Sequence, residues 1–256
     1  MCFILVGLKV RPDYPLVIAA NRDEFLQRPT ASAHWWHHGF LAGKDIEQGG
    51  TWLGVSKSGR FAAVTNLRSP ANIQSPRSRG ELVSGFLRGK ISADAYYRSL
   101  ESRLYHYRPF NLLTGDLDGL YYFNNRHKGL QELTPGVYGL SNAFLDTPWP
   151  KMVDGKHTFA NHLNLEKLDT EGLFGLLRNP HTYTDDELPQ SDLDRHRERQ
   201  LSAIFIEGEQ YATRSSTVLL FRNNGDAYYE ERSYSGRLEG PDQCQFEFKL
   251  ETGQCD

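Results

Sequence analysis

The chain contains little cysteine, with three residues of this type among 256, at positions 2, 244 and 255. They form no Cys-x-x-Cys pair of the kind that binds structural zinc, and an odd number does not make a complete disulfide set. We therefore expect a protein of a reducing compartment, with the cytoplasm as the default location.

Long apolar runs and long basic blocks are also missing. The first apolar stretch, residues 2–8, has no basic segment before it and is too short for a signal peptide or a membrane-spanning helix. The net charge is −3, which gives no electrostatic support for binding nucleic acid or an anionic membrane surface. We expect a soluble protein without a membrane span and without a nucleic-acid partner.

Motifs for metals and nucleotides are absent too. The nine histidines are scattered, with no His-Glu-x-x-His pattern, and Gly49-Gly50 lacks the lysine of a phosphate-binding loop. The sequence thus predicts no metal site and no required cofactor. One local feature suits a bound haem, because His34, His37 and His38 offer imidazoles beside two tryptophans. A half-buried surface segment explains the same residues.

The composition is that of a folded globular protein. It is 39% hydrophobic and 24% charged, and no repeat or low-complexity linker divides the chain. We therefore predict one domain over residues 1–256.

Strand patterns occupy both ends of the chain and helix patterns lie between them. Strands are predicted at residues 2–8, 15–20, 51–55, 61–65, 110–113, 120–123, 217–221, 227–231 and 244–250. Helices are predicted within residues 78–104 and at 151–164, 170–178 and 192–206. Residues 26–50 and 67–78 are predicted to be irregular loops that set specificity. This order favours a layered α+β domain over alternating βαβ units.

Cys2 stands directly after Met1 and opens the first predicted strand. Removal of Met1 would leave one residue with both a thiol and a free α-amine, and an amine with a pKa of about 8 is a suitable base for the thiol proton. Nucleophile and base would then share one residue, as they do in N-terminal threonine enzymes. The alternative is that Cys2 is simply a small buried residue at the start of a strand.

Several polar residues follow predicted strands. Asn21-Arg22-Asp23-Glu24 comes after residues 15–20, Asn66 follows Val64-Thr65, and Ser141-Asn142 follows residues 138–140. Each group also suits local turn chemistry, and Arg22 beside two acids suits a salt-bridge cluster.

Together these segments resemble the NRDE family, also called the transport and Golgi organisation family. The blocks that carry the resemblance run in order along the chain: Met1-Cys2, residues 21–25 with Arg28-Pro29, residues 49–54, Thr65-Asn66, residues 79–82, residues 139–142 with Pro148-Trp149, and residues 213–217. That family in turn resembles the cysteine branch of the N-terminal nucleophile (Ntn) hydrolases, which includes penicillin V acylase and bile-salt hydrolase. The resemblance implies an Ntn-hydrolase-like fold, a four-layer αββα sandwich.

The resemblance also implies a set of site residues. The catalytic residues it implies are Cys2, Asp23, Asn66, Asn142 and Arg214. In these roles Asp23 orients the α-amine, the two asparagines donate to an oxyanion, and Arg214 favours the thiolate. The binding residues that it implies, from the same blocks, are Asn21, Arg22, Glu24, Trp52 and Ser141. Whether Arg22 or Asn21 takes the polar role assigned to Asp23 stays open.

Two functions follow from the resemblance. The first is cleavage of an amide, ester or thioester of a small acylated metabolite through Cys2. The alternative is a non-catalytic trafficking protein that binds haem, a lipid or acyl-coenzyme A in the same pocket. The identity of the substrate and the oligomeric state are not determined by the sequence.

Overall fold

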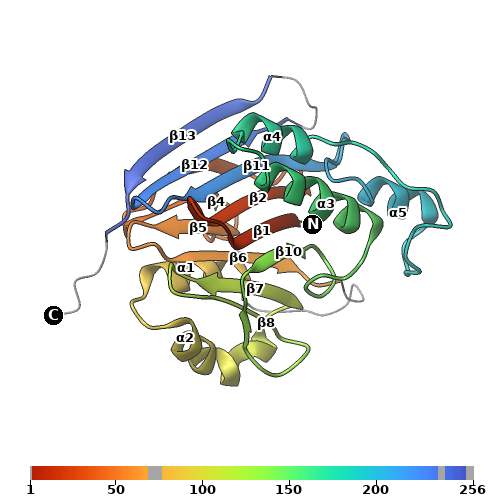
Figure 1. The fold of residues 1–256 in the computed structure, drawn as a ribbon. Helices are drawn as coiled ribbons and strands as arrows, with labels where there is room; N and C mark the ends of the chain where they lie inside the picture. Colours follow the sequence, from red (N-terminus) through yellow and green to blue (C-terminus); the bar gives the residue numbers. More distant parts are fainter. Residues whose placement is uncertain (1, 69–76, 236–239, 252–256) are drawn as a thin grey trace.

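Two antiparallel β-sheets stack face to face in the computed structural model, which describes residues 2–68, 77–235 and 240–251 (Figure 1). The six-stranded sheet runs in the order β10 (Gly136–Leu140), β1 (Cys2–Arg11), β2 (Tyr14–Phe25), β11 (Tyr211–Phe221), β12 (Asp226–Ser233) and β13 (Asp242–Lys249). The seven-stranded sheet runs in the order β3 (Thr30–Trp35), β4 (Phe40–Asp45), β5 (Leu53–Ser56), β6 (Phe61–Asn66), β7 (Phe110–Gly115), β8 (Leu120–Asn124) and β9 (Gln131–Leu133).

Helices cover the outer face of each sheet. Helices α3 (Pro150–Leu163) and α4 (Thr170–Leu177) lie over the six-stranded sheet, and α5 (Arg195–Leu201) follows them along the chain. Helices α1 (Gly80–Arg88) and α2 (Ala93–Leu100), with the 3₁₀ helix η1 (Glu101–His106), lie over the seven-stranded sheet. None of the helices in the described ranges has the length and apolar content that crossing a membrane requires.

The hydrophobic core has three layers because side chains alternate along each strand. On β1, Ile4 and Val6 face the opposite sheet, whereas Phe3 and Leu5 pack under α3 and α4. A third apolar layer joins α1 and α2 to the seven-stranded sheet. The predicted four-layer αββα sandwich is therefore confirmed.

Both hairpins expected from turn residues are present. Strands β1 and β2 pair on either side of residues 12–13, and β5 and β6 pair on either side of residues 57–60. The helix expected at 192–206 is shorter, because α5 ends at Leu201.

The expectation of an irregular loop over residues 26–50 is wrong. This segment contains β3 and β4, which form the edge of the seven-stranded sheet. Only Ala33 of β3 is buried, so the strand lacks the apolar alternation that would have revealed it. Of the second expected loop, residues 69–76 lie outside the described residues.

Candidate active site

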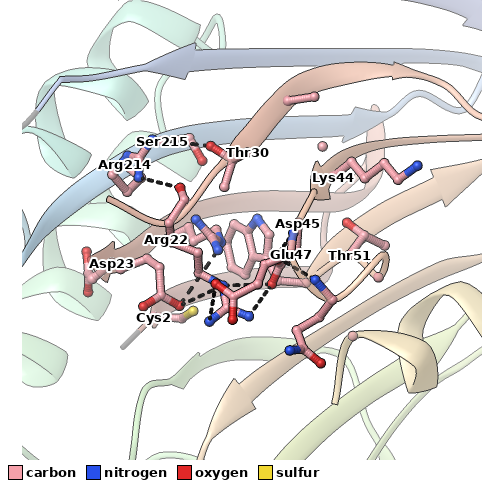
Figure 2. A pocket seen from close by; sticks show the side chains of 18 of the residues that line it. Cys2, Arg22, Asp23, Thr30, Lys44, Asp45, Glu47, Thr51, Arg214 and Ser215 are labelled. Carbon is pink, nitrogen blue, oxygen red and sulfur yellow. Dashed lines mark hydrogen bonds and ion pairs between the residues drawn. The ribbon is translucent and has the colours of Figure 1, made fainter. Parts of the chain in front are cut away.

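Cys2 begins β1 on the face that looks toward the other sheet. Its pairing places it opposite Arg22 of β2, and it borders a cavity of about 710 Å³ that residues of both sheets line (Figure 2). The residue is only 8% exposed, and burial raises the pKa of its thiol to about 11. At neutral pH the sulfur is consequently protonated, and it needs a base nearby to act as a nucleophile.

The backbone of Cys2 is held by the residues that follow β10. Strand β10 pairs with β1, so its end lies beside the start of β1. The Cys2 nitrogen donates to Asn142 Oδ1 at 3.4 Å, and Ser141 Oγ donates to the Cys2 carbonyl oxygen at 2.9 Å. The Asn142 amide nitrogen donates to the carbonyl oxygen of Asn66 at 2.7 Å. Two predicted site residues, Asn66 and Asn142, thus meet next to Cys2.

Buried side chains of the other sheet fix the segment that carries Asn142. Thr65 Oγ1 donates to the Ser141 carbonyl oxygen at 2.6 Å, and Asn111 Nδ2 donates to the Ala143 carbonyl oxygen at 2.8 Å. Asn111 and Thr65 also bond to each other at 3.0 Å. The site therefore joins both sheets, and Asn142 is held from two sides.

Asp23 is a buried carboxyl beside Cys2, with 2% of its surface exposed. Thr213 Oγ1 donates to Asp23 Oδ1 at 2.7 Å and itself accepts from the Ile206 nitrogen at 2.8 Å. Burial raises the pKa of Asp23 above its usual value, and the charge of buried Lys151 acts in the opposite direction. Lys151 donates to the carbonyl oxygens of residues 201 and 203, and burial lowers its pKa to about 8.

Arg214 lies at a β-bulge, because Thr213 pairs with Asp23 while the next pair joins Ser215 to Arg22. Its guanidinium donates to the carbonyl oxygens of residues 25, 26 and 28, at 2.9 to 3.1 Å. Figure 2 shows Arg214 set apart from Cys2, on the far side of Arg22. Burial raises the pKa of Cys2, whereas the charge of Arg22 lowers it, and the charge of Arg79 also interacts with Cys2. In position, Arg22 therefore suits the thiolate-favouring role expected of Arg214.

The residues predicted to bind a ligand divide into two groups. Arg22, Glu24 and Trp52 line the cavity. Asn21 and Ser141 do not. Asn21 is fully buried and donates to the carbonyl oxygens of Leu177 and Ile204, so it anchors the helical layer instead of contacting a ligand. Adjacent residues on a strand face opposite sides, which separates Asn21 from Arg22.

The cavity wall is rich in charge of both signs. Its basic residues are Arg22, Arg28, Lys44, Arg77, Arg79, Arg108 and Arg214. Its acidic residues are Asp23, Glu24, Asp45, Glu47, Glu231 and Asp242. The segment with His34, His37 and His38 is not part of this wall, which has few apolar side chains. Such a wall suits a polar, charged ligand better than a porphyrin or a long acyl chain.

Several residues of the site were not predicted from the sequence, among them Thr213, Lys151, Arg79 and Glu231. Thr213 and Arg79 lie within the family blocks. Glu231 follows Ala227 and Tyr229 at intervals of two residues along β12, and these two residues face the core. The alternation therefore predicts that Glu231 points inward. Lys151 has no comparable signal, because only the packing of α3 buries it.

The family model described as "Transport and Golgi organisation 2" matches residues 1–236. The chain belongs to this family. The bovine Transport and Golgi organization protein 2 homolog is 35% identical over 261 residues, covering 92% of this chain and 94% of that protein. The human homolog is 33% identical and covers 98% of this chain and 100% of its own length. The Drosophila melanogaster protein of this family is 26% identical and covers 92% and 93%.

Solved structures with the same fold are, by name, an acylase, an amidase and a bile acid hydrolase. Penicillin V acylase from Agrobacterium tumefaciens has a TM-score of 0.53 at 12% identity, over 97% of this chain and 86% of that one. The Caenorhabditis elegans ortholog of N-acylethanolamine-hydrolyzing acid amidase has a TM-score of 0.54 at 11% identity, over 86% and 92%. A mutant of conjugated bile acid hydrolase from Clostridium perfringens has a TM-score of 0.51 at 9% identity, over both whole chains. At these identities the likeness extends to the fold alone.

Proposed function

We propose that this protein is a cysteine Ntn hydrolase that, after removal of Met1, cleaves an amide, ester or thioester of a small, polar acylated metabolite. One observation carries the proposal. The Cys2 nitrogen, which becomes the α-amine once Met1 is gone, already donates to Asn142 Oδ1 at the edge of a charged cavity. This contact supports a mechanism in which Cys2 supplies both nucleophile and base and Asn142 orients the base.

The first half of the reaction forms an acyl-enzyme. The Cys2 sulfur attacks the carbonyl carbon of the substrate, and its proton passes to the α-amine. When the tetrahedral intermediate collapses, the carbon–heteroatom bond breaks and the leaving group takes that proton. Cys2 is left as a thioester and the amine is neutral again. Water then attacks the thioester with the same amine as base, which releases the acid and restores the thiol.

Neighbouring residues stabilise the ammonium, oxyanion and thiolate charges that form during the reaction. Asn142 Oδ1 already accepts from the nitrogen that becomes the α-amine, and in this mechanism the buried Asp23 carboxylate favours the ammonium form of that amine. The side-chain amides of Asn66 and Asn142 are the donors for the oxyanion, and one such donor lowers the activation barrier by about 2.7–4 kcal/mol. The charge of Arg22 favours the thiolate.

The test compares wild type with Cys2→Ala and with the control Cys244→Ala, which removes the half-buried thiol of β13. Intact mass establishes first that Met1 has left each protein. We expect wild type and the control to hydrolyse members of a panel of short amides, esters and thioesters and to accumulate a covalent adduct of acyl mass. Equal turnover by processed Cys2→Ala, or none by processed wild type on the whole panel, contradicts the proposal.

A carrier for haem or an acyl-coenzyme A thioester is the second candidate function, supported by the transport role in the family's name. Haem is tested by spectral titration of wild type and of a triple variant lacking His34, His37 and His38. The absence of a Soret shift with wild type rules out haem binding. An equal shift in both proteins means that these histidines do not ligate the haem.

A further inference from the structure

Glu231 is a buried carboxyl at the cavity wall for which the proposed reaction has no use. It lies on β12 with 3% of its surface exposed. The Ala33 nitrogen donates to its Oε1 at 2.8 Å, and among the described residues no cation forms an ion pair with it. Burying a carboxylate without an opposite charge is costly. The described part of the chain thus keeps a buried carboxyl without a paired cation at the cavity wall.

The wall opposite Glu231 leaves room for a ligand. Gly43 of β4 also lines the cavity, and a Cβ at this position would lie 3.3 Å from Glu231 Oε2 and 3.3 Å from the Ala31 carbonyl oxygen. The missing side chain keeps the space next to Oε2 open. Ser32 and Ser233 border the same part of the wall, with their hydroxyl oxygens 3.4 Å apart. A carboxylate and two hydroxyls are the acceptors that a primary ammonium group, with three donors, requires.

The other acids of the wall are already matched or exposed. Asp45 pairs with Arg28 at 2.7 Å, and Glu24 lies 3.7 Å from Arg22. Glu47 lies 3.7 Å from Arg28 and is exposed to solvent, as is Asp242. Asp23 accepts from Thr213. Glu231 is therefore a buried wall carboxyl that, within the described ranges, has no ion pair, and it lies away from the Asp23 and Cys2 end of the cavity.

Among the described residues, the titratable groups around Glu231 leave its charge without a close partner. Burial raises the pKa of Glu231 to about 7, and Arg22 is the cation whose charge opposes that effect. The titratable groups that also face it are Tyr229, on the same strand, and Cys244 of β13, both neutral at pH 7 because burial raises their pKa values. A cation that binds at Oε2 supplies the missing opposite charge.

Distance excludes a direct part in the chemistry at Cys2. Strands β1 and β12 are separated by β2 and β11, so three strand spacings of about 4.8 Å put them about 14 Å apart. Through the cross-strand pairs, Cys2 aligns with Ser233, and Glu231 lies two residues before Ser233 on the same face of β12. Glu231 therefore faces the end of the substrate that is remote from the scissile bond.

We propose that Glu231 binds a primary ammonium group at the remote end of the substrate, so that the protein selects acyl compounds with a terminal amine. This inference rests on the proposed function for the position of the scissile bond. The binding subsite itself is independent of turnover.

The first experiment measures binding by calorimetry in the Cys2→Ala background, in which no turnover occurs. The probes are ω-aminoalkanamides long enough to span the distance, each compared with the alkanamide of equal length without the amine. We expect the amine to improve affinity and Glu231→Gln to remove that gain, about tenfold to a hundredfold. Gly43→Ala keeps the charge but fills the space near Oε2, so it reduces the gain as well.

The matched control is Glu47→Gln, which removes the same charge from the exposed rim of the same cavity. We expect this variant to keep the preference for the amine. Circular dichroism verifies that each variant is folded, and the side-chain amide introduced by Glu231→Gln retains an oxygen for the Ala33 nitrogen. The proposal is overturned by wild-type-like binding in Glu231→Gln, by an equal loss in Glu47→Gln, or by a lack of amine preference in the parent protein.

A kinetic arm separates this proposal from the proposed function. Processed wild type is assayed with ω-aminoacyl para-nitroanilides and with the matching acyl para-nitroanilides. We expect the terminal amine to lower KM, and Glu231→Gln to raise it without a change in kcat. Amine-dependent binding without turnover refutes the hydrolase and leaves the subsite standing. Turnover without any amine preference refutes the subsite alone.

Discussion

Cys2 shows how the chemistry of one residue depends on its immediate neighbours. It is both a buried strand residue, 8% exposed with a thiol pKa of about 11, and a residue whose nitrogen is already held by Asn142. The first property keeps the thiol protonated at neutral pH. In the proposed mechanism, the second holds the amine that removal of Met1 would free, so that this amine can act as the base.

The pH dependence of the reaction follows from that base. An α-amine has a pKa of about 8, and only its neutral form accepts the thiol proton. We therefore expect kcat/KM of processed protein to fall about tenfold for each pH unit below about 8 and to level off above it. Initial rates at constant ionic strength measure this profile, and a rate that stays flat down to about pH 5 would show that another group is the base.

Glu231 makes a second residue-scale prediction, for stability. Its pKa is raised from 4.5 to about 7 on folding, so the folded protein keeps a proton that the unfolded chain releases. The associated stability is fully present below pH 4.5 and is lost as the pH rises to about 7. The free energy of unfolding of Glu231→Gln minus that of wild type should therefore rise by about 3 kcal/mol from pH 4.5 to pH 8. Urea unfolding at both ends of this range measures the gain, and a constant difference would contradict it. Glu47→Gln is the control.

At the scale of elements, the bulge in β11 determines what its arginine does. The extra residue turns Arg214 onto the connection between β2 and β3, where it satisfies three backbone carbonyl oxygens. The same shift leaves Thr213 opposite Asp23 and Ser215 opposite Arg22. One irregular position thereby sets the neighbours of Asp23 and of the arginine opposite Cys2.

We expect Arg214→Leu to reduce the free energy of unfolding by about 2–3 kcal/mol, because the carbonyl oxygens lose charged donors. Arg214→Lys should not restore it, since an ammonium does not reproduce the planar fork. The pH dependence of Cys2 alkylation should stay unchanged in both variants. Arg199→Leu, which breaks an exposed ion pair with Asp185, is the control and should cost less than about 1 kcal/mol. If Arg214→Lys restored stability and Arg214→Leu shifted the pH dependence of Cys2 alkylation, then Arg214 would be the residue that favours the Cys2 thiolate.

At the scale of the whole molecule, the core between the sheets couples the two halves. It contains residues of β1 and β2 together with residues of β5, β6 and β7. Separating the sheets would therefore expose apolar side chains of both to water. Cys2 and Asn142 depend on that coupling, because Thr65 and Asn111 of the seven-stranded sheet hold the segment after β10.

The prediction of one domain is tested by cooperativity. Trp149 precedes α3, whereas Trp35 and Trp52 belong to the side of the seven-stranded sheet. We expect urea unfolding of wild type and of Trp149→Phe, followed by fluorescence and by far-UV circular dichroism, to give one common midpoint. Separate midpoints for the two probes would mean that the layers unfold independently.

Prediction from the sequence succeeded where a local signal exists. The β1–β2 and β5–β6 hairpins were readable from apolar strands around turn residues, and the ordered blocks indicated both the family and the fold. Strand β3 was missed because it lies at a sheet edge with one buried residue, so its pairing with β4 stabilises it more than its own pattern does.

The sequence by itself determined the layered fold and the candidate nucleophile, because alternation, turn residues and the position of Cys2 are local properties of the chain. The tertiary structure decided which polar residues meet. The register of β2 sends Asn21 toward the helices and Arg22 toward the cavity, and the bulge in β11 directs Arg214 to a turn. A shift of one residue exchanges the two faces of a strand, and register depends on contacts between segments far apart in the chain.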